Sequence, residues 1–231
     1  MKLRFLVNSV AVCVLLALSA CGVGHSGKHI SEGVITYKLD FPESENSSSL
    51  VTFLPKEMTM SFKDNSSVMQ INGWGGSFGL TYFNDHKNKK NYAMLRIMFK
   101  TYICVSDLDV ISFGYSKISD LQVSSTSDTL TICGYLCRGL KAESKNANKK
   151  FEAWVTDDIE LSHSNNSTPY KDVEGVLMRF DVLMCGIYMK MEATKVEDVK
   201  VPDEIFSVPD DAIYVTRQEL EELIGSFDRK K

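Results

Sequence analysis

The chain has 231 residues, of which 26 are basic and 30 are acidic, and its isoelectric point lies near 5.6. This acidic balance argues against nucleic acid as a partner, because phosphate binding needs a basic face. No apolar run of about 18 residues follows position 21, so the body of the chain is not expected to contain a transmembrane helix.

The first 27 residues allow two interpretations. Lys2 and Arg4 precede an apolar stretch over 5–18, and Leu18-Ser19-Ala20-Cys21 then resembles a lipobox. This layout predicts a lipoprotein signal peptide over 1–20, whose removal leaves Cys21 lipidated as the first mature residue. The alternative is a G-x-G-x-x-G dinucleotide fingerprint over 22–27. That motif needs a folded strand before it and a helix after it, and neither is predicted.

A flexible tether over 21–31 and a single β-rich domain over 32–231 are predicted to follow. Alternation of apolar and polar residues indicates a mainly β fold, with Asn, Asp, Lys and Ser clusters at the turns. The predicted strands cover 33–41, 50–62, 67–72, 77–83, 91–99, 100–105, 109–115, 129–142, 151–156, 175–184 and 186–196. The longest irregular piece is predicted at 161–175.

One helix is predicted, at the C-terminus. Thr216 and Glu219 have the spacing of a capping box, and an apolar stripe follows at helical spacing. The stripe is formed by Leu220, Leu223, Ile224 and Phe227. The opposite face is expected to be solvated, and it carries Arg217, Glu219, Glu221 and Glu222.

Methionine is unusually placed, since nine of the ten lie beyond the signal. Met178, Phe180 and Met184 share one side of a predicted strand, and Met189 and Met191 share one side of the next. Flexible thioether side chains suit an apolar cavity for a lipid-like ligand, so these five residues form the candidate ligand face. The alternative is that they fill the core of a curved sheet.

Four cysteines remain once Cys13 and Cys21 are set aside: Cys104, Cys133, Cys137 and Cys185. In an oxidising compartment they permit two disulfides in three connectivities, and free thiols are the alternative. On one straight strand Cys133 and Cys137 would lie roughly 13 Å apart, beyond disulfide reach. A local bridge would need a bend, for which Gly134 is the obvious candidate.

Catalytic and metal-binding patterns are weak. Gly24-His25-Ser26-Gly27 begins like a nucleophile elbow, but Lys28 stands where the motif needs glycine. His25 and His29 would meet only on a helix, which the surrounding turn residues disfavour. Asp157, Asp158 and Glu160 are interpreted as an acidic turn. The prediction is therefore a protein that is not an enzyme, with no metal or cofactor.

From Glu32 to Phe227 the chain resembles a family of bacterial lipoproteins of unknown function, the GLPGLI type, which is similar to the Lol-type lipoprotein carriers and sorting factors. The resemblance rests on MTMSFKDNSSVMQ (58–70), NDHKNKKNYAM (84–94), TLTICGYLCRGLKA (129–142), FEAWVTDDIE (151–160), the turn from Pro169 to Gly175 before GVLMRFDV and MEATKVEDVKVPDEIFSVPD (191–210). It implies a strongly curved antiparallel sheet, an open or half barrel whose concave face is covered by helix or loop and holds acyl chains. It also implies Cys137 as a recurrent position. The single predicted helix departs from the carriers, which use several pieces to cover the mouth.

Location and role follow as expectations. Gly22, in place of the aspartate typical of inner-membrane retention, favours the outer membrane of a Gram-negative bacterium. No acidic run follows Cys21 as a surface-export signal would require, so attachment facing the periplasm is expected. The first hypothesis is a tethered binder of a lipid-like ligand, which predicts a cavity of about 300 Å³ or more. The second is a protein-interaction module of the envelope, with Trp74 or Trp154 as contact candidates.

Overall fold

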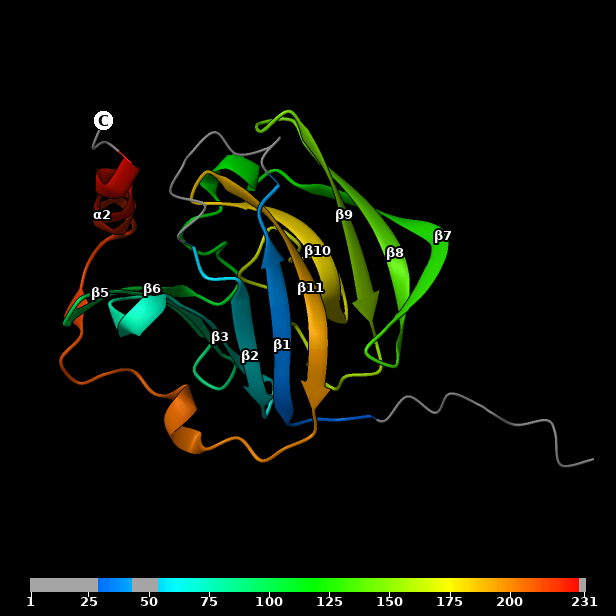
Figure 1. Cartoon of the computed structure of the whole chain (residues 1–231), viewed down its shortest axis with the longest axis horizontal. Coiled ribbons are helices and arrows are strands. Elements are labelled where there is room, and N and C mark those ends of the chain that lie inside the picture. The colour runs from blue at the N-terminus through cyan, green and yellow to red at the C-terminus, as the bar shows by residue number, and fades with distance from the viewer. Residues whose placement is uncertain (1–28, 43–53, 229–231) are drawn as a thin grey trace, which may run out of the picture.

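A computed structural model describes residues 29–42 and 54–228. Within these ranges twelve strands form one curved, open sheet, so the predicted mainly β fold is confirmed (Figure 1). The strands are β1 Gly33–Asp40, β2 Glu57–Lys63, β3 Ser66–Asn72, β4 Phe78–Asp85, β5 Lys90–Ile97, β6 Lys100–Asp107, β7 Gln122–Ile132, β8 Tyr135–Ser144, β9 Lys149–Thr156, β10 Val176–Met184, β11 Ile187–Glu197 and β12 Ile213–Tyr214. The helices are the 3-10 turns η3 Trp74–Gly76, η4 Ser116–Ile118 and η5 Asp203–Phe206, and the α-helix α2 Arg217–Asp228. Cys21, the signal peptide and most of the tether lie outside the described residues.

The sheet consists of two antiparallel meanders, β1 to β6 and β7 to β11, joined where β1 pairs with β11. Its edges are β7 and the short β12, which pairs with β6 in parallel, so the sheet is mixed rather than purely antiparallel. The β6–β7 connection over 108–121 must pass from β6, next to one edge of the sheet, to β7 at the opposite edge. We call it the crossing segment.

Alternation along β1 explains its place in the middle of the sheet. Ile35, Tyr37 and Leu39 are fully buried, whereas Lys38 and Asp40 are exposed. Side chains on a strand point to opposite faces in turn, so the three apolar residues share the inner face that holds the main core.

The region 129–142 forms a hairpin, which corrects the prediction of a single strand. Cys133 and Gly134 occupy the turn between β7 and β8, with φ of 52° and 86°. Two positive φ values match the turn type that suits the twist of a hairpin, for which Asn-Gly is the usual signature. Cys185 and Gly186 repeat the arrangement between β10 and β11, with φ of 52° and 79°.

The crossing segment corrects the strand predicted over 109–115. Phe113 and Tyr115 are buried, as strand alternation would require, but the segment pairs with no strand. These side chains instead cover the inner face, together with Ile118 and Leu121. The first half of β7 escaped prediction because its exposed Ser and Thr residues give no apolar alternation.

A second, smaller core lies on the outer face of β3 to β6. It contains Val68, Phe83, Met94 and Ile103. The chain after β11 covers this cluster with Ile205, Phe206, Val208 and Ala212. We call residues 202–216 the C-terminal strap. They cross the outer face, include β12 and lead into α2.

The capping box of α2 is confirmed. The Thr216 backbone N–H donates to the Glu219 carboxylate at 2.7 Å, and the Glu219 N–H donates to Thr216 Oγ1 at 3.2 Å. Leu220 is fully buried in the main core. Arg217, expected on the solvated face, instead donates to the carbonyl oxygens of Ile111 and Ser112 at 2.9 and 3.1 Å. Among the described helices, none has both the length and the apolar character needed to span a membrane.

Candidate functional site

The candidate site is the inner face, where all five predicted ligand-face residues are buried. Phe180, Met184 and Met191 line a central cavity, whereas Met178 and Met189 are buried outside its lining. β10 and β11 position these residues by alternation. All five are therefore buried and three of them line the cavity, while ligand binding by this face stays a prediction.

The other half of the lining comes from strands that precede the crossing segment. Tyr37, Met58, Met60, Met69 and Tyr82 project from β1 to β4 toward the same cavity. The sequence shows their alternation, but it does not reveal that β1 pairs with β11. Without that pairing, the methionines of β2 and β3 could not be assigned to the same face as Met191.

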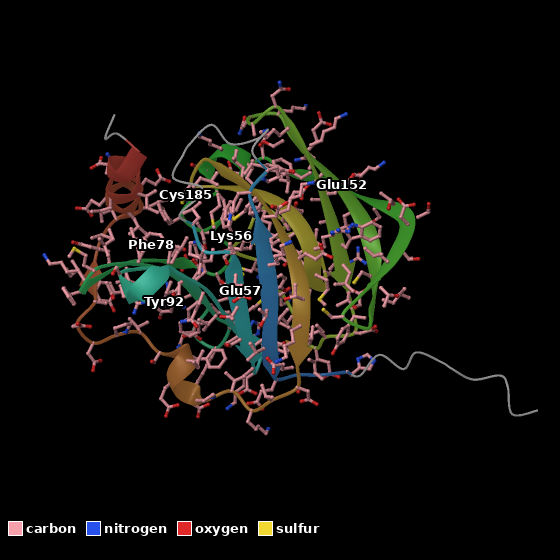
Figure 2. All side chains as sticks on the ribbon, in the orientation of Figure 1. Lys56, Glu57, Phe78, Tyr92, Glu152 and Cys185 are labelled. Atoms are coloured by element: carbon pink, nitrogen blue, oxygen red, sulfur yellow. The ribbon has the colours of Figure 1, made fainter. Side chains whose placement is uncertain are left out.

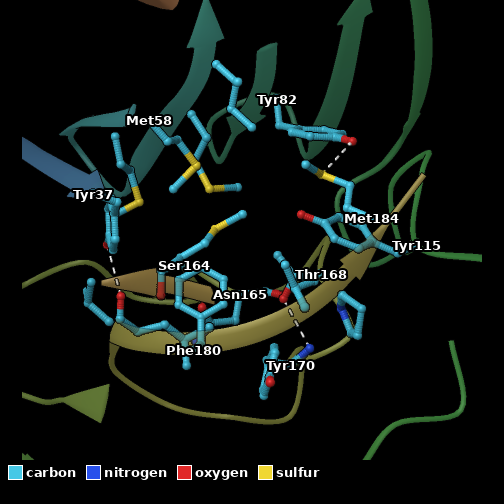
Figure 3. A pocket seen from close by; sticks show the side chains of 18 residues that line it. Tyr37, Met58, Tyr82, Tyr115, Ser164, Asn165, Thr168, Tyr170, Phe180 and Met184 are labelled. Carbon is cyan, nitrogen blue, oxygen red and sulfur yellow. Dashed lines mark hydrogen bonds between the residues drawn. The ribbon is translucent and has the colours of Figure 1, made fainter. Parts of the chain in front are cut away.

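A loop between β9 and β10 closes the cavity from the open side. Figure 3 shows Met58 on one side of the cavity and Ser164 and Thr168 on the other. We call residues 164–170 the plug. The plug belongs to the irregular piece predicted over 161–175, and that prediction is confirmed because no strand or helix forms there.

Hydrogen bonds hold the plug in place. The Tyr170 hydroxyl donates to the carbonyl oxygen of Asp181 at 2.7 Å, which fastens the plug to β10. Asn165 donates to the carbonyl oxygens of Val173 and Gly175 at 2.8 and 2.9 Å. These bonds satisfy backbone groups that a buried loop would otherwise leave unpaired.

A buried polar network then joins the plug to the crossing segment. The side-chain oxygen of Asn84, on β4, accepts hydrogen bonds from Ser167 Oγ at 2.5 Å and from Asn91 Nδ2 at 2.6 Å. Ser112 Oγ donates to the Asn91 oxygen at 2.5 Å, and the Ser112 N–H donates to the Ser167 carbonyl at 2.7 Å. Both segments that fill the inner face are therefore tied to each other and to the sheet.

The space left between sheet and plug is small. The cavity measures about 30 Å³, which is room for very few water molecules. The first hypothesis predicts about 300 Å³ or more. In this conformation the protein's own side chains fill the inner face, and an acyl chain has no room.

The tyrosines of the site favour their neutral forms. Burial raises the pKa of the phenols of Tyr37, Tyr82, Tyr115 and Tyr170. Burial also raises the pKa of Asp181, although the hydrogen bond from Tyr188 opposes the shift. The tyrosines therefore serve as hydrogen-bond donors that anchor loops, such as Tyr37 to Leu177 O at 2.9 Å and Tyr82 to Phe113 O at 2.8 Å.

The four described cysteines are free thiols in this structure. Gly134 does provide a bend between Cys133 and Cys137, but no bridge forms across it. Burial raises the pKa of Cys137 to about 11 and that of Cys185 to about 12. Since the thiolate is the nucleophile, both thiols are held in their unreactive form.

His86 and His163 stack at one end of the inner face. Their ring centroids lie 6.1 Å apart with 8° between the planes, which brings the β4–β5 turn against the loop that leads into the plug. His86 Nδ1 is buried without a hydrogen-bond partner among the described residues. His29 lies apart and exposed, and His25 lies outside the described residues. Within the described part of the chain, no three His, Cys, Asp or Glu side chains are grouped as a metal site requires.

The acidic turn predicted at 157–160 lies beside an open polar groove of about 590 Å³. Asp157 and Glu160 line it together with Asp64 and Glu174. Asp157 accepts a hydrogen bond from Arg138 at 3.4 Å, and the Arg138 guanidinium also donates to the Glu174 carbonyl at 2.7 Å. The carboxylates thus face solvent rather than one another across a closed cleft.

The two tryptophans predicted as contact residues differ in setting. Trp154, on β9, is half-buried and packs against the main core, so it is not a free contact residue. Trp74 begins η3 in the β3–β4 turn, and its side chain lies outside the described part of the structure.

Known proteins share the fold but little of the sequence. No family model and no curated protein matches the chain. Two solved structures of PNGF-II, in the C2 and P21 space groups, superpose with TM-scores of 0.52 and 0.55 at 14% identity. The matches cover 84% of this chain and 32% and 33% of the PNGF-II chains, so this chain spans about one third of their length. The likeness concerns the fold, and the resemblance to GLPGLI-type lipoproteins stays a prediction.

Proposed function

We propose that this protein is a non-enzymatic, lipid-anchored interaction module of the bacterial envelope, which binds a protein partner through its outer surface. One observation carries the proposal: the inner face is filled to within about 30 Å³, while apolar and aromatic side chains remain exposed at the sheet edge. Binding is therefore expected on the outside of the sheet.

The contact surface we propose consists of Tyr92, Val105 and Tyr214, which we call the outer patch. Val105 pairs with Tyr92, and Tyr214 pairs with Ile103 of the outer core, so all three share the outer face. Tyr92, which is labelled in Figure 2, stacks on Phe83 with ring centroids 5.3 Å apart and is thereby held in place. Tyr214 is 68% exposed. Rigid aromatic side chains are the residues that most often dominate protein interfaces.

Attachment is proposed through acylated Cys21 at the outer membrane, facing the periplasm. The support is the Leu18-Ser19-Ala20-Cys21 sequence, with Gly22 after it. Intact mass of the protein from its host is expected to match a chain starting at Cys21 plus acyl groups. An unmodified Cys21 would contradict this part of the proposal.

Site-specific cross-linking tests the outer patch. A photoreactive amino acid replaces Tyr214 in the full chain in its host, and Lys195, which is also exposed, serves as the matched control position. We expect one adduct of defined mass at position 214, absent at 195, and lost when Val105→Asp places a charge in the patch. Equal adducts at both positions, or an adduct that survives Val105→Asp, would contradict the proposal.

The methionine-rich lining supports a second candidate, an apolar ligand that enters when the plug moves. Met58, Met60 and Met69 can repack around a guest because their side chains are unbranched and flexible. Native mass spectrometry of the protein from its host separates the two candidates. A protein free of non-covalent lipid favours the interaction module, whereas a co-purifying lipid that Met60→Trp displaces favours the second candidate.

A further inference from the structure

The turn between β5 and β6 exposes two large apolar side chains. Met98 and Phe99 are its two residues, and they are 65% and 94% exposed. The turn is braced, because the Met98 N–H donates to the Ser77 carbonyl of the adjacent β3–β4 turn at 2.6 Å. Phe78, at the start of β4 and labelled in Figure 2, pairs with Ile97, the residue before the turn. The two side chains therefore project from a rigid end of the sheet.

Folding does not account for the residues at this turn. Met98 has a φ of 54°, a conformation that glycine or asparagine adopts more readily. Phe99 is almost fully exposed and so gains little from the core. Departures from local turn chemistry that bring no packing gain are expected at functional positions.

Two cations flank the apolar pair. Arg96 lies two residues before Met98, Lys100 follows Phe99 directly, and both are exposed. Neither forms an ion pair within the described part of the chain, and Arg96 donates only to the Asn72 side chain at 3.4 Å. Asp210 and Asp211 come just before β12, which is the strand paired with β6, and their negative charges partly offset these two positive charges. Apolar insertion should therefore contribute more than charge attraction.

A lipid surface fits this shape better than a protein does. A stable protein interface covers about 800 Å² on each partner, more than a projection of two residues offers. A bilayer interface accepts a few apolar side chains and pairs the adjacent cations with anionic headgroups. We propose that the β5–β6 turn is a membrane-contact site, in which Met98 and Phe99 insert among the lipids while Arg96 and Lys100 lie at the headgroups.

The contact is separate from both the outer patch and the predicted acyl anchor. The turn lies at the opposite end of the strands from Gly33, since Gly33 pairs with Phe62 and the register continues through Ser67 and Asn84. A chain that starts at Gly22 retains every described residue and carries no acyl group, so it isolates the turn. Failure of the outer patch would leave this contact unaffected.

Vesicle co-sedimentation tests the proposal. The chain from Gly22 is mixed with vesicles of phosphatidylcholine alone or of phosphatidylcholine with phosphatidylglycerol. We expect binding to both, with preference for the anionic vesicles. Met98→Ser with Phe99→Ser should lower the affinity at least ~10-fold, because two apolar side chains leave the lipid. Arg96→Gln with Lys100→Gln should remove only the anionic preference.

Matched variants keep the result interpretable. Tyr214→Ser removes an exposed aromatic residue elsewhere and should leave vesicle binding unchanged, and Phe99→Trp should tighten it. Unchanged thermal unfolding of every variant is expected, since the altered side chains are exposed. No binding by the unaltered chain, or full binding after Met98→Ser with Phe99→Ser, would overturn the proposal.

Discussion

Asn84 is the residue on which the filling of the inner face depends most directly. Its side-chain oxygen accepts bonds from both Ser167 and Asn91, and Asn91 in turn accepts one from Ser112. A buried network of this kind specifies one arrangement of the loops, because each member left unpaired would be costly.

Asn84→Ala is expected to lower the free energy of unfolding by about 2–3 kcal/mol, because it leaves buried donors on Ser167 and Asn91 without their acceptor. Urea denaturation measures the change. Asn72→Ala removes an exposed asparagine from the neighbouring strand and should cost less than ~0.5 kcal/mol. Equal losses of unfolding free energy in the two variants would show that the buried network does not stabilise the fold more than an exposed side chain does.

His86 introduces a dependence on pH. Burial is the largest cause that lowers its pKa below the ordinary 6.5, followed by the charges of Lys89 and His163, while Asp85 acts in the opposite direction. The folded state therefore prefers the neutral ring, and the unfolded chain binds the proton more readily. Stability should fall as the pH drops below 6.5.

His86→Gln should flatten this loss, which urea midpoints at pH ~7 and pH ~5.5 would reveal. His29→Gln, at an exposed histidine outside the stack, is the control and should keep the full dependence. Hydrogen-exchange protection across 161–175, after correction for the slower intrinsic exchange at the lower pH, should be weaker at pH ~5.5 than at pH ~7 in the unaltered protein. If stability falls with pH as much in His86→Gln as in the unaltered protein, the pH dependence belongs to other groups.

Among the elements, the C-terminal strap takes the place of a covering helix. The outer face of β3 to β6 has its own apolar cluster, and the strap supplies Phe206 against Phe83 with centroids 6.1 Å apart. Lys63 fastens the start of η5 through Asp203 at 2.7 Å.

Phe206→Ala should lower the free energy of unfolding by about 1–2 kcal/mol, because a half-buried ring and one edge-on aromatic contact are lost. Phe99→Ala is the matched control at a phenylalanine that is almost fully exposed, and its effect should stay within ~0.5 kcal/mol. Thermal unfolding followed by circular dichroism measures both. A cost for Phe99→Ala equal to that of Phe206→Ala would contradict the assignment.

Elements whose signals are local could be predicted from the sequence. The alternation of β1 and the capping box of α2 each depend on neighbouring residues, and both are confirmed. The hairpin at Cys133 could not be predicted, because Cys-Gly is not a usual turn pair. The position of the plug could not be predicted either. Ser167 bonds to Asn84, 83 residues away in the sequence, and patterns among neighbouring residues do not indicate such a long-range contact.

At the scale of the molecule, the β1–β11 pair joins two meanders into one sheet with one main core. Tyr37, from the first meander, donates its hydroxyl to Leu177 of the second. Residues of both meanders belong to the same buried cluster. The two meanders should therefore unfold together.

The two tryptophans test this, because Trp74 lies in the first meander and Trp154 in the second. Trp154→Phe and Trp74→Phe variants each report one meander by fluorescence during urea unfolding. In each variant, the urea midpoint from fluorescence is expected to equal the midpoint from circular dichroism, as in a cooperative transition. Fluorescence midpoints that depart from the circular dichroism midpoint of the same variant would show that the meanders unfold separately.

The pairing of the first strand with the last long one also affects how the protein is made. Leu177, to which Tyr37 is bonded, is synthesised 140 residues later, which takes on the order of ten seconds at ordinary ribosomal speed. Until then β1 has a neighbour on one side only, and the main core cannot close. The nascent chain therefore cannot complete its main core until β10 and β11 have been synthesised.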